Sequence, residues 1–138
     1  MSKDRVPDLP IGVAVMDWKA PPIPLAAPLQ GDYARVEPLD VATHSDSLFA
    51  AFAEDGTEQG WTYMGYGPFA DKAQFDEWLV GSWLGADPMF FSILEQSSDT
   101  ALGMASFMNI NPAGGSIEVG NIHLSPSLRK TRVATDAM

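Results

Sequence analysis

The 138-residue sequence contains no cysteine and only two histidines. Without cysteine the chain forms no disulfide and has no thiolate to act as a nucleophile or a metal ligand, which is typical of a reducing compartment. His44 and His123 are far apart in the sequence, and two histidines cannot close a zinc site without several carboxylates. The chain also has no glycine-rich Walker loop and no nucleophile-elbow serine. We therefore expect no bound metal.

Positive charge is scarce as well. Eight Lys and Arg stand against 18 Asp and Glu, for a net charge of −10, which disfavours non-specific binding to nucleic acid or to an anionic membrane. No apolar run approaches the roughly 20 residues that cross a bilayer. The short run LPIGVAVM meets Asp17 and Trp18 where a signal peptide would have a small-residue cleavage site. We therefore expect a cytoplasmic protein with neither nucleic acid nor a membrane as partner.

Apolar residues make up 46% of the chain, which is enough for one domain with a real core. Residues 1–31 hold six of the eleven prolines. Proline donates no backbone hydrogen bond and favours extended structure, so this segment should be an arm that lies over the domain, with Trp18 pinning it to the core. Residues 32–138 are expected to form the domain itself.

Two helices are expected in the first half of the domain. Asp40 is placed to cap a helix over about 41–54, with Gly56 as its stop. Asp71 and Gln74 form a capping box for a second helix, over about 72–84. His44, one turn into the first helix, is expected to have a structural role.

Strand-like segments precede and follow these helices. The last three are separated by SSDT and NPAGG, which have the composition of hairpin turns, so they should form an antiparallel meander. The four segments are residues 33–39, 89–96, 101–110 and 116–125. The order predicts an α+β fold in which helices pack on a mostly antiparallel sheet.

Two segments have patterns that suggest function. Residues 57–70 (TEQGWTYMGYGPFA) are rich in aromatic residues and glycine, which fits either a functional lid or an aromatic plug closing one end of the core. Arg129, Lys130 and Arg132 lie between the last strand and a helical start, where free N–H groups favour an anion. This cluster is either a phosphate site or a solvated turn.

Several stretches together resemble the N-terminal half of the GCN5-related N-acetyltransferases (GNAT), in particular their ribosomal-protein-acetyltransferase-like branch. The stretches are the Pro-rich lead, LQGDYARVEPLD, GWTYMGYGPF, FDEWL and IEVGNIHLSPSLRKTRVATDAM. The resemblance implies a GNAT-like fold (the acyl-CoA N-acyltransferase fold). It also implies acetyl-CoA-dependent transfer of an acetyl group to an amine of a small molecule or of a protein N-terminus.

The resemblance also implies where acetyl-CoA would bind. Main-chain groups of Asn121, Ile122 and His123 would face the thioester. The pyrophosphate loop of the family reads Gln/Arg-x-x-Gly-x-Gly/Ala, and the matching residues are Arg129, Lys130, Thr131, Arg132, Val133 and Ala134. Arg129 and Ala134 fit this pattern. Arg132 replaces the central glycine, so its side chain either obstructs the approach of the phosphates or adds a cation for them.

Catalysis requires a base to deprotonate the amine and a backbone donor for the oxyanion. Glu118 is the first candidate for the base and His123 the second, although each fits equally the ordinary role of an exposed strand carboxylate or a half-buried histidine. Strand alternation places Glu118 with Ile122 on one face and His123 on the other. By resemblance Trp61, Tyr63 and Tyr66 would line the acceptor cleft, unless they are core residues.

The sequence ends shortly after the start of the expected coenzyme-binding helix. We therefore expect a truncated GNAT domain, and three functions remain open: an N-acetyltransferase, an inactive module that binds coenzyme A, and an interaction domain. The edge of the strand at 116–125 has no lysine or proline to guard it, which predicts self-association along this strand.

Overall fold

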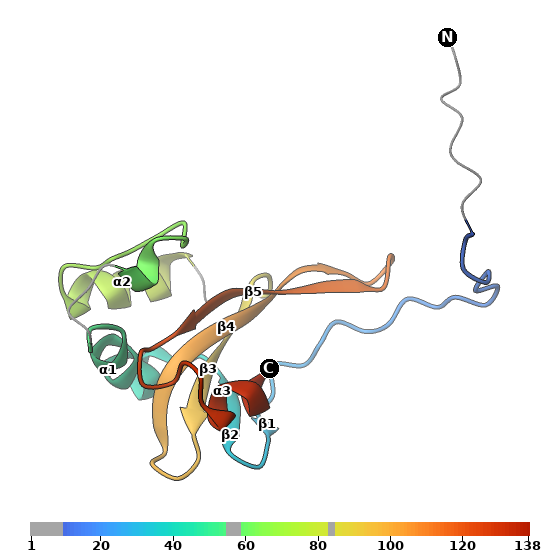
Figure 1. Ribbon diagram of the computed structural model, residues 1–138. Coiled ribbons are helices and arrows are strands. Elements are labelled where there is room, and N and C mark those ends of the chain that lie inside the picture. The colour runs from blue at the N-terminus through green and yellow to red at the C-terminus, as the bar shows by residue number, and fades with distance from the viewer. Residues whose placement is uncertain (1–9, 55–58, 83–84) are drawn as a thin grey trace.

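The structure is a computed structural model that describes residues 10–54, 59–82 and 85–138. At its centre is a five-stranded antiparallel sheet in which the strands follow one another in chain order (Figure 1). The strands are β1 (Leu29–Gln30), β2 (Ala34–Pro38), β3 (Met89–Glu95), β4 (Thr100–Asn111) and β5 (Ser116–Leu124). The α+β class and the meander of the last three strands are confirmed, and the four predicted strands end within one residue of their expected bounds.

Helices cover the two faces of the sheet. On one side lie α1 (Val41–Phe52), the 3-10 turn η1 (Gln59–Trp61) and α2 (Lys72–Ser82); on the other lies the short α3 (Arg132–Ala137) (Figure 1). Two buried clusters follow from this arrangement, because side chains of a strand alternate between faces. Phe90 of β3 packs with α1 and α2, whereas Ile93 of the same strand packs with Val133 of α3.

The helix starts confirm the capping predictions. The carboxylate of Asp40 accepts the N–H of Thr43 at 2.9 Å, and that of Asp71 accepts the N–H of Gln74 at 2.9 Å. The side chain of Gln74 reaches back to the N–H of Ala70 at 3.3 Å, one residue earlier than in an ideal capping box. The first helix ends at Phe52, with Ala53 as its C-cap, and not at about 54 as predicted; the predicted stop at Gly56 lies outside the described residues.

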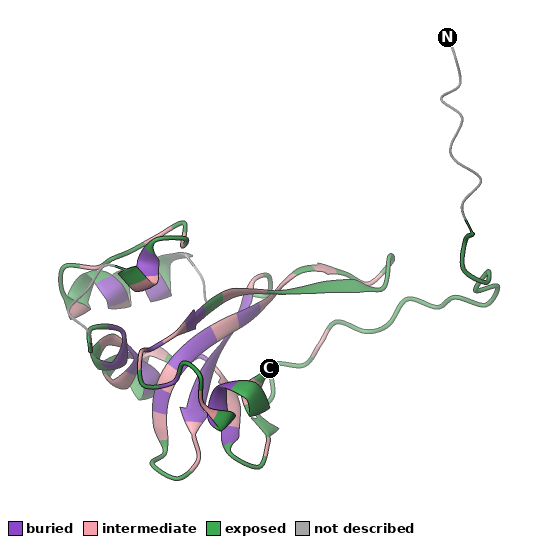
Figure 2. Ribbon diagram, in the orientation of Figure 1, coloured by how far each residue is buried: buried purple, intermediate pink, exposed green. Residues whose placement is uncertain are grey.

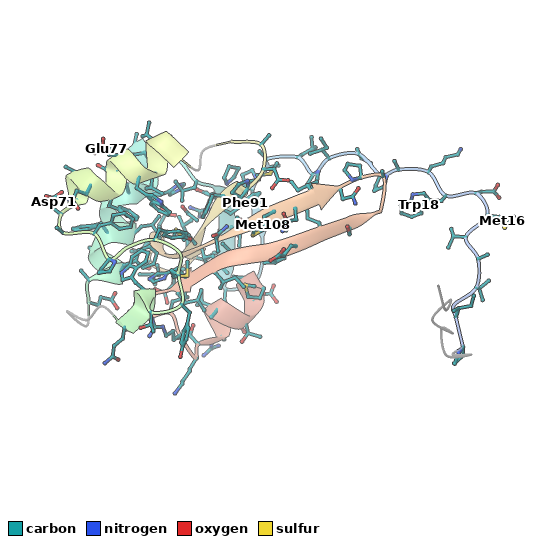
Figure 3. All side chains as sticks on the ribbon, turned by 90° about the horizontal axis from the view of Figure 1, so that it is seen from above. Met16, Trp18, Asp71, Glu77, Phe91 and Met108 are labelled. Atoms are coloured by element: carbon teal, nitrogen blue, oxygen red, sulfur yellow. The ribbon has the colours of Figure 1, made fainter. Side chains whose placement is uncertain are left out.

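The Pro-rich arm differs from its prediction. Residues 10–28 are extended but run away from the domain along the β4–β5 hairpin and past its tip (Figures 1 and 3). Trp18 donates its indole N–H to the carbonyl of Ala113 at 3.0 Å and rests on Gly115, which has a left-handed φ of 64° in the turn. Its ring therefore pins the arm to the hairpin tip and not to the core, and 52% of Trp18 stays exposed.

Burial is concentrated at one end of the sheet. In Figure 2 the buried residues lie where β3 and β4 meet the helices, while the outer half of the β4–β5 hairpin and the arm are exposed. The end of β5 that leads into α3 lies near this buried part of the sheet. Residues there are supported by the core and still have access to solvent.

Candidate functional site

The strand β5 contains one more residue than the facing part of β4. Ser106 pairs with Gly120, and Met104, two positions earlier, pairs with His123, three positions later. Asn121 accommodates the extra residue with a left-handed φ of 51°. Such a β-bulge removes residues from the ladder and redirects their backbone groups. Asn121 and Ile122 accordingly have no strand partner in the described register.

The bulge overturns the strict alternation that we predicted for β5. His123 contacts Phe52 on the side of α1, whereas the next residue, Leu124, packs against the cluster under α3. Val119 also faces the α3 side, where it lines a small groove with Phe91. Val119 and His123 were expected on the same face and lie on opposite ones, because one inserted residue reverses the facing of every later side chain. Glu118, two residues before Gly120, is thereby on the same side as His123.

A chain of hydrogen bonds ties the bulge to the aromatic segment before α2. The hydroxyl of Tyr66 donates to Oδ1 of Asn121 at 3.1 Å, and Nδ2 of Asn121 donates to Oγ of Ser106 at 2.9 Å. Ser106 in turn donates to the carbonyl of Gly120 at 3.2 Å. Burial raises the pKa of Tyr66 well above its ordinary value, so its hydroxyl remains a donor at neutral pH. The side chain of Asn121 is therefore held from both sides.

His123 is enclosed by aromatic rings. Its imidazole stacks on Trp61, with centroids 4.0 Å apart, and meets the edge of Phe52 at 4.2 Å. Only 4% of the residue is exposed. A ring in this position has little access to a substrate.

The three aromatic residues expected to line a cleft have different environments. Trp61 is buried in the α1–α2 core, Tyr66 is half-buried against Trp78 of α2, and Tyr63 is 98% exposed. The packing of Trp61 and Phe69 against this core matches the aromatic plug. The hydroxyl of Tyr66 lies toward the bulge, and the side chain of Tyr63 lies toward solvent.

Glu118 is exposed on β5 and is oriented by an amide. Its carboxylate accepts from Nδ2 of Asn109 at 2.6 Å across the hairpin. Asn109 has a left-handed φ of 49° beside a second register shift, and Asp87 accepts the backbone N–H groups of Asn109 and Ile110 at 3.0 Å each. The carboxylate of Glu118 is thus positioned by the loop that follows α2.

The side chains of Arg129 and Arg132, in the loop after β5 and at the start of α3, point to different parts of the molecule. Nε of Arg129 donates to the carbonyl of Leu124 at 2.9 Å, which turns this side chain back toward Gly60. Arg132 lies over the ring of Tyr33, 4.9 Å from its centroid, as in a cation–π contact. Lys130 is exposed, with a left-handed φ of 61°. The expected second cation, Arg132, is therefore directed toward the β1–β2 turn.

The start of α3 offers backbone donors to an anion. Thr131 is the N-cap, and its hydroxyl accepts the N–H of Ala134 at 3.2 Å. Val133 and Ala134 have buried side chains, so only their backbones can take part in binding. Among the described residues, the N–H groups of Arg132 and Val133 have no acceptor, as expected in a first helical turn.

Two carboxylates hold this loop and helix in place. Glu54, just after α1, accepts both the N–H and the hydroxyl of Ser127 at 3.0 and 2.9 Å. Asp136 of α3 accepts the N–H groups of Tyr33 and Ala34 at 2.8 and 2.9 Å, and these bonds hold the pKa of its carboxyl below the ordinary value. The orientation of α3 is thereby fixed against the β1–β2 turn.

Sequence reasoning missed the side-chain roles of Asn121, Asn109 and Asp87. A signal was present for the first, because the Gly120–Asn121 pair inside a strand is typical of a bulge. His44 was expected to be structural and is buried, with Nδ1 accepting the N–H of Asp40 and Nε2 bonded to Glu37, each at 3.0 Å.

The described part of the chain contains no cluster of three or more His, Cys, Asp or Glu residues that could hold a metal ion. Within the same residues, no helix has the length and apolar character to span a membrane.

Comparison with known proteins identifies the fold. No protein-family model and no curated protein matches the sequence. A GCN5-related N-acetyltransferase from Brucella melitensis superposes with a TM-score of 0.83 at 36% identity, over 88% of this chain and 55% of that chain. A probable acetyltransferase of the GNAT family from Chromobacterium violaceum gives 0.82 at 32% identity, over 96% and 66%. The GNAT-family acetyltransferase from Bacillus anthracis gives 0.61 at 13%, over 80% and 60%, and supports the fold alone.

The chain therefore has the GNAT fold, as the resemblance implied, and its similarity to the first two structures supports its place in the GNAT superfamily. It spans 55% and 66% of the lengths of those two relatives.

Proposed function

We propose that the chain carries the acyl-donor half of an acetyl-CoA-dependent N-acetyltransferase of the ribosomal-protein-acetyltransferase-like branch. The observation that carries the proposal is the bulge of β5 followed directly by the basic loop and α3, in a fold shared with GNAT enzymes at 36% and 32% identity. Asn121 and Ile122 in the bulge have no residue opposite them in the register with β4, and the loop offers cations and free N–H groups.

The acetyl-CoA phosphates would bind the loop of Arg129, Lys130 and Thr131 and the backbone of the first turn of α3. The thioester would lie along the bulge, with backbone N–H groups at Asn121 to His123 facing its carbonyl oxygen. These donors would stabilise the oxyanion that forms when the amine attacks the carbonyl carbon. The carbon–sulfur bond then breaks, and the thiolate leaves with the electron pair and takes up a proton.

Glu118 is our candidate for the base that removes the proton of the acceptor ammonium, because it is exposed and held by Asn109 on the same side as the bulge. The buried imidazole of His123 would support the site by packing. The acceptor is proposed to be an amine of a small molecule or of a protein N-terminus, and Tyr63 and Tyr66 lie on the aromatic segment that would face it.

Two measurements on the 138-residue chain test this proposal. Isothermal titration with coenzyme A should show binding, and acetyl-CoA with a panel of amines should release free thiol. Binding without release of thiol would indicate a coenzyme A-binding module. The absence of both would refute the proposed site in this chain.

We also propose that the protein is cytoplasmic and that its partner there is a second copy of the same chain. In the described sheet β5 is an outer strand, and Ile117 and Val119 on it are 45% and 47% exposed. Unguarded edges recruit other chains, so we propose self-association along residues 116–125. Light scattering of the wild type should detect oligomers that Ile117→Lys, distant from the bulge, disperses. A wild-type monomer at all concentrations would contradict this proposal.

A further inference from the structure

We propose that Tyr66 is a positioning residue for the β5 bulge: its hydroxyl holds the side chain of Asn121, and Asn121 sets the direction of the backbone donors in the bulge. This inference rests on the function proposed above. It assigns to the aromatic segment a role in building the acyl-donor site, in addition to its packing in the core.

The geometry connects four groups in series. Tyr66 donates to Asn121 at 3.1 Å, Asn121 donates to Ser106 at 2.9 Å, and Ser106 donates to the carbonyl of Gly120 at 3.2 Å. The series begins on the segment before α2, crosses β5 to β4 and returns to the residue that precedes the bulge. Both polar atoms of the Asn121 side chain are used within it.

The position of Tyr66 is itself fixed by packing. Its ring lies 4.3 Å from that of Trp78 on α2 and 6.2 Å from that of Trp61. The hydroxyl is therefore presented to Asn121 from a rigid base, with little freedom to turn away. A residue held in this way can transmit the position of α2 to the bulge.

Asn121 needs such support because its backbone is in the left-handed region, at φ 51°. Asparagine enters this region more readily than most residues, yet it still prefers extended backbone when nothing holds it. Asn121 and Ile122 have no residue opposite them in the described ladder, so the regular pairing of the sheet is interrupted at both. The side chain of Asn121 holds the residue in this conformation through its bonds with Tyr66 and Ser106 and a longer one to the sulfur of Met108, at 3.6 Å.

The direction of a donor matters more than its presence for an oxyanion. A displacement of about 1 Å at a reacting centre can cost roughly 100-fold in rate. Loss of the Tyr66 hydroxyl should therefore lower kcat. It should leave the KM for acetyl-CoA nearly unchanged, because most contacts with the coenzyme would be made by the loop after β5 and by α3 and not by the bulge.

The first test needs no catalysis. In 15N–1H spectra of the full chain, Tyr66→Phe should shift the amide signals of Asn121 and Ile122 and speed their hydrogen exchange about 10-fold. Tyr33→Phe is the matched control, because its ring lies under Arg132 between β1 and β2 and its hydroxyl has no bond among the described residues. Unchanged signals at Asn121 and Ile122 in Tyr66→Phe would overturn the proposal.

A second variant separates positioning from packing. Glycine adopts left-handed backbone freely, so in Asn121→Gly the bulge no longer depends on a side-chain bond. Tyr66→Phe should then have no further effect on exchange at Ile122 or on kcat. An equal effect in both backgrounds would mean that Tyr66 acts only through the core, and the proposal would be wrong.

The outcome is distinguishable from failure of the proposed function. If the wild type releases no thiol from acetyl-CoA, the catalytic assignment fails, whereas the amide spectra and the exchange measurements still decide whether Tyr66 holds the bulge. If the wild type turns over, kcat of Tyr66→Phe should fall about 10-fold, and a change confined to KM would contradict the positioning role.

Discussion

Replacing both Arg129 and Lys130 with alanine should weaken coenzyme A binding without unfolding the chain. Neither side chain has a carboxylate partner among the described residues, so their charges are available to an anion. Nε of Arg129 is committed to the carbonyl of Leu124 at 2.9 Å, which leaves its terminal amino groups for a phosphate. An exposed ion pair contributes about 0.2–1 kcal/mol and a charge-assisted hydrogen bond about 1.5–3 kcal/mol. For two exposed groups we expect a loss of about 1–3 kcal/mol, which raises Kd about 5- to 150-fold.

Isothermal titration at two salt concentrations measures this loss. The affinity of the wild type should fall as salt rises, and that of the double variant should fall less, because salt screens exposed charges. Arg129→Gln removes the charge but keeps an N–H group that can donate to the carbonyl of Leu124. It therefore tests the contribution of the charge apart from that of this hydrogen bond. The double variant Lys3→Ala/Lys19→Ala, outside the loop, loses the same two positive charges and controls for the change in net charge. A Kd of the double variant within twofold of the wild type would show that the cluster is a solvated turn.

Three further predictions concern the core, α3 and the base. Phe52→Ala should lower the free energy of unfolding by about 3–5 kcal/mol, measured by denaturant titration, because Phe52 is only 6% exposed. The control Val80→Ala, at a site that is 64% exposed, should change this free energy by less than about 0.5 kcal/mol. Equal effects of the two variants would contradict the described core. The depressed pKa of Asp136 means that its bonds stabilise the fold above the ordinary value of 3.8 and are lost as the pH falls through the lower native pKa. The amide signal of Tyr33 should therefore shift in acid in the wild type and stay constant in Asp136→Asn. A wild-type Tyr33 signal that does not change with pH would contradict the hydrogen bond between Tyr33 and Asp136. Glu118→Gln should reduce kcat about 100-fold or more if this carboxylate is the base, with the Kd for coenzyme A unchanged, and a normal pH–rate profile would exclude that role.

The parts of the fold that the sequence predicted are those with local causes. A carboxylate three residues before a free N–H sets the start of a helix, and both Asp40 and Asp71 do so here. Turn composition likewise predicted the hairpins, since glycine at 115 has the left-handed backbone that the NPAGG turn requires. These signals lie within a few residues of their effect.

The candidate site was less predictable because its geometry depends on distant contacts. The facing of His123 follows from the register between β4 and β5, and no short pattern specifies that register. The direction of Arg132 follows from Tyr33, which lies in the β1–β2 turn at the other end of the described domain sequence. The arm shows the same limit, since its extended form was predictable but the position of Trp18 at the hairpin tip was not.

The two loops that flank α2 act on the same hairpin. Before the helix, Tyr66 holds Asn121 at the first register shift; after it, Asp87 holds Asn109 at the second, and Asn109 holds the carboxylate of Glu118. The helix itself is fixed to the core by Phe75 and Leu79, which are fully buried. The segments before and after α2 thus each make a polar contact with the hairpin, one at Asn121 and one beside Glu118. The bulge donors and the base proposed above would therefore both depend on segments that lie next to the same buried helix.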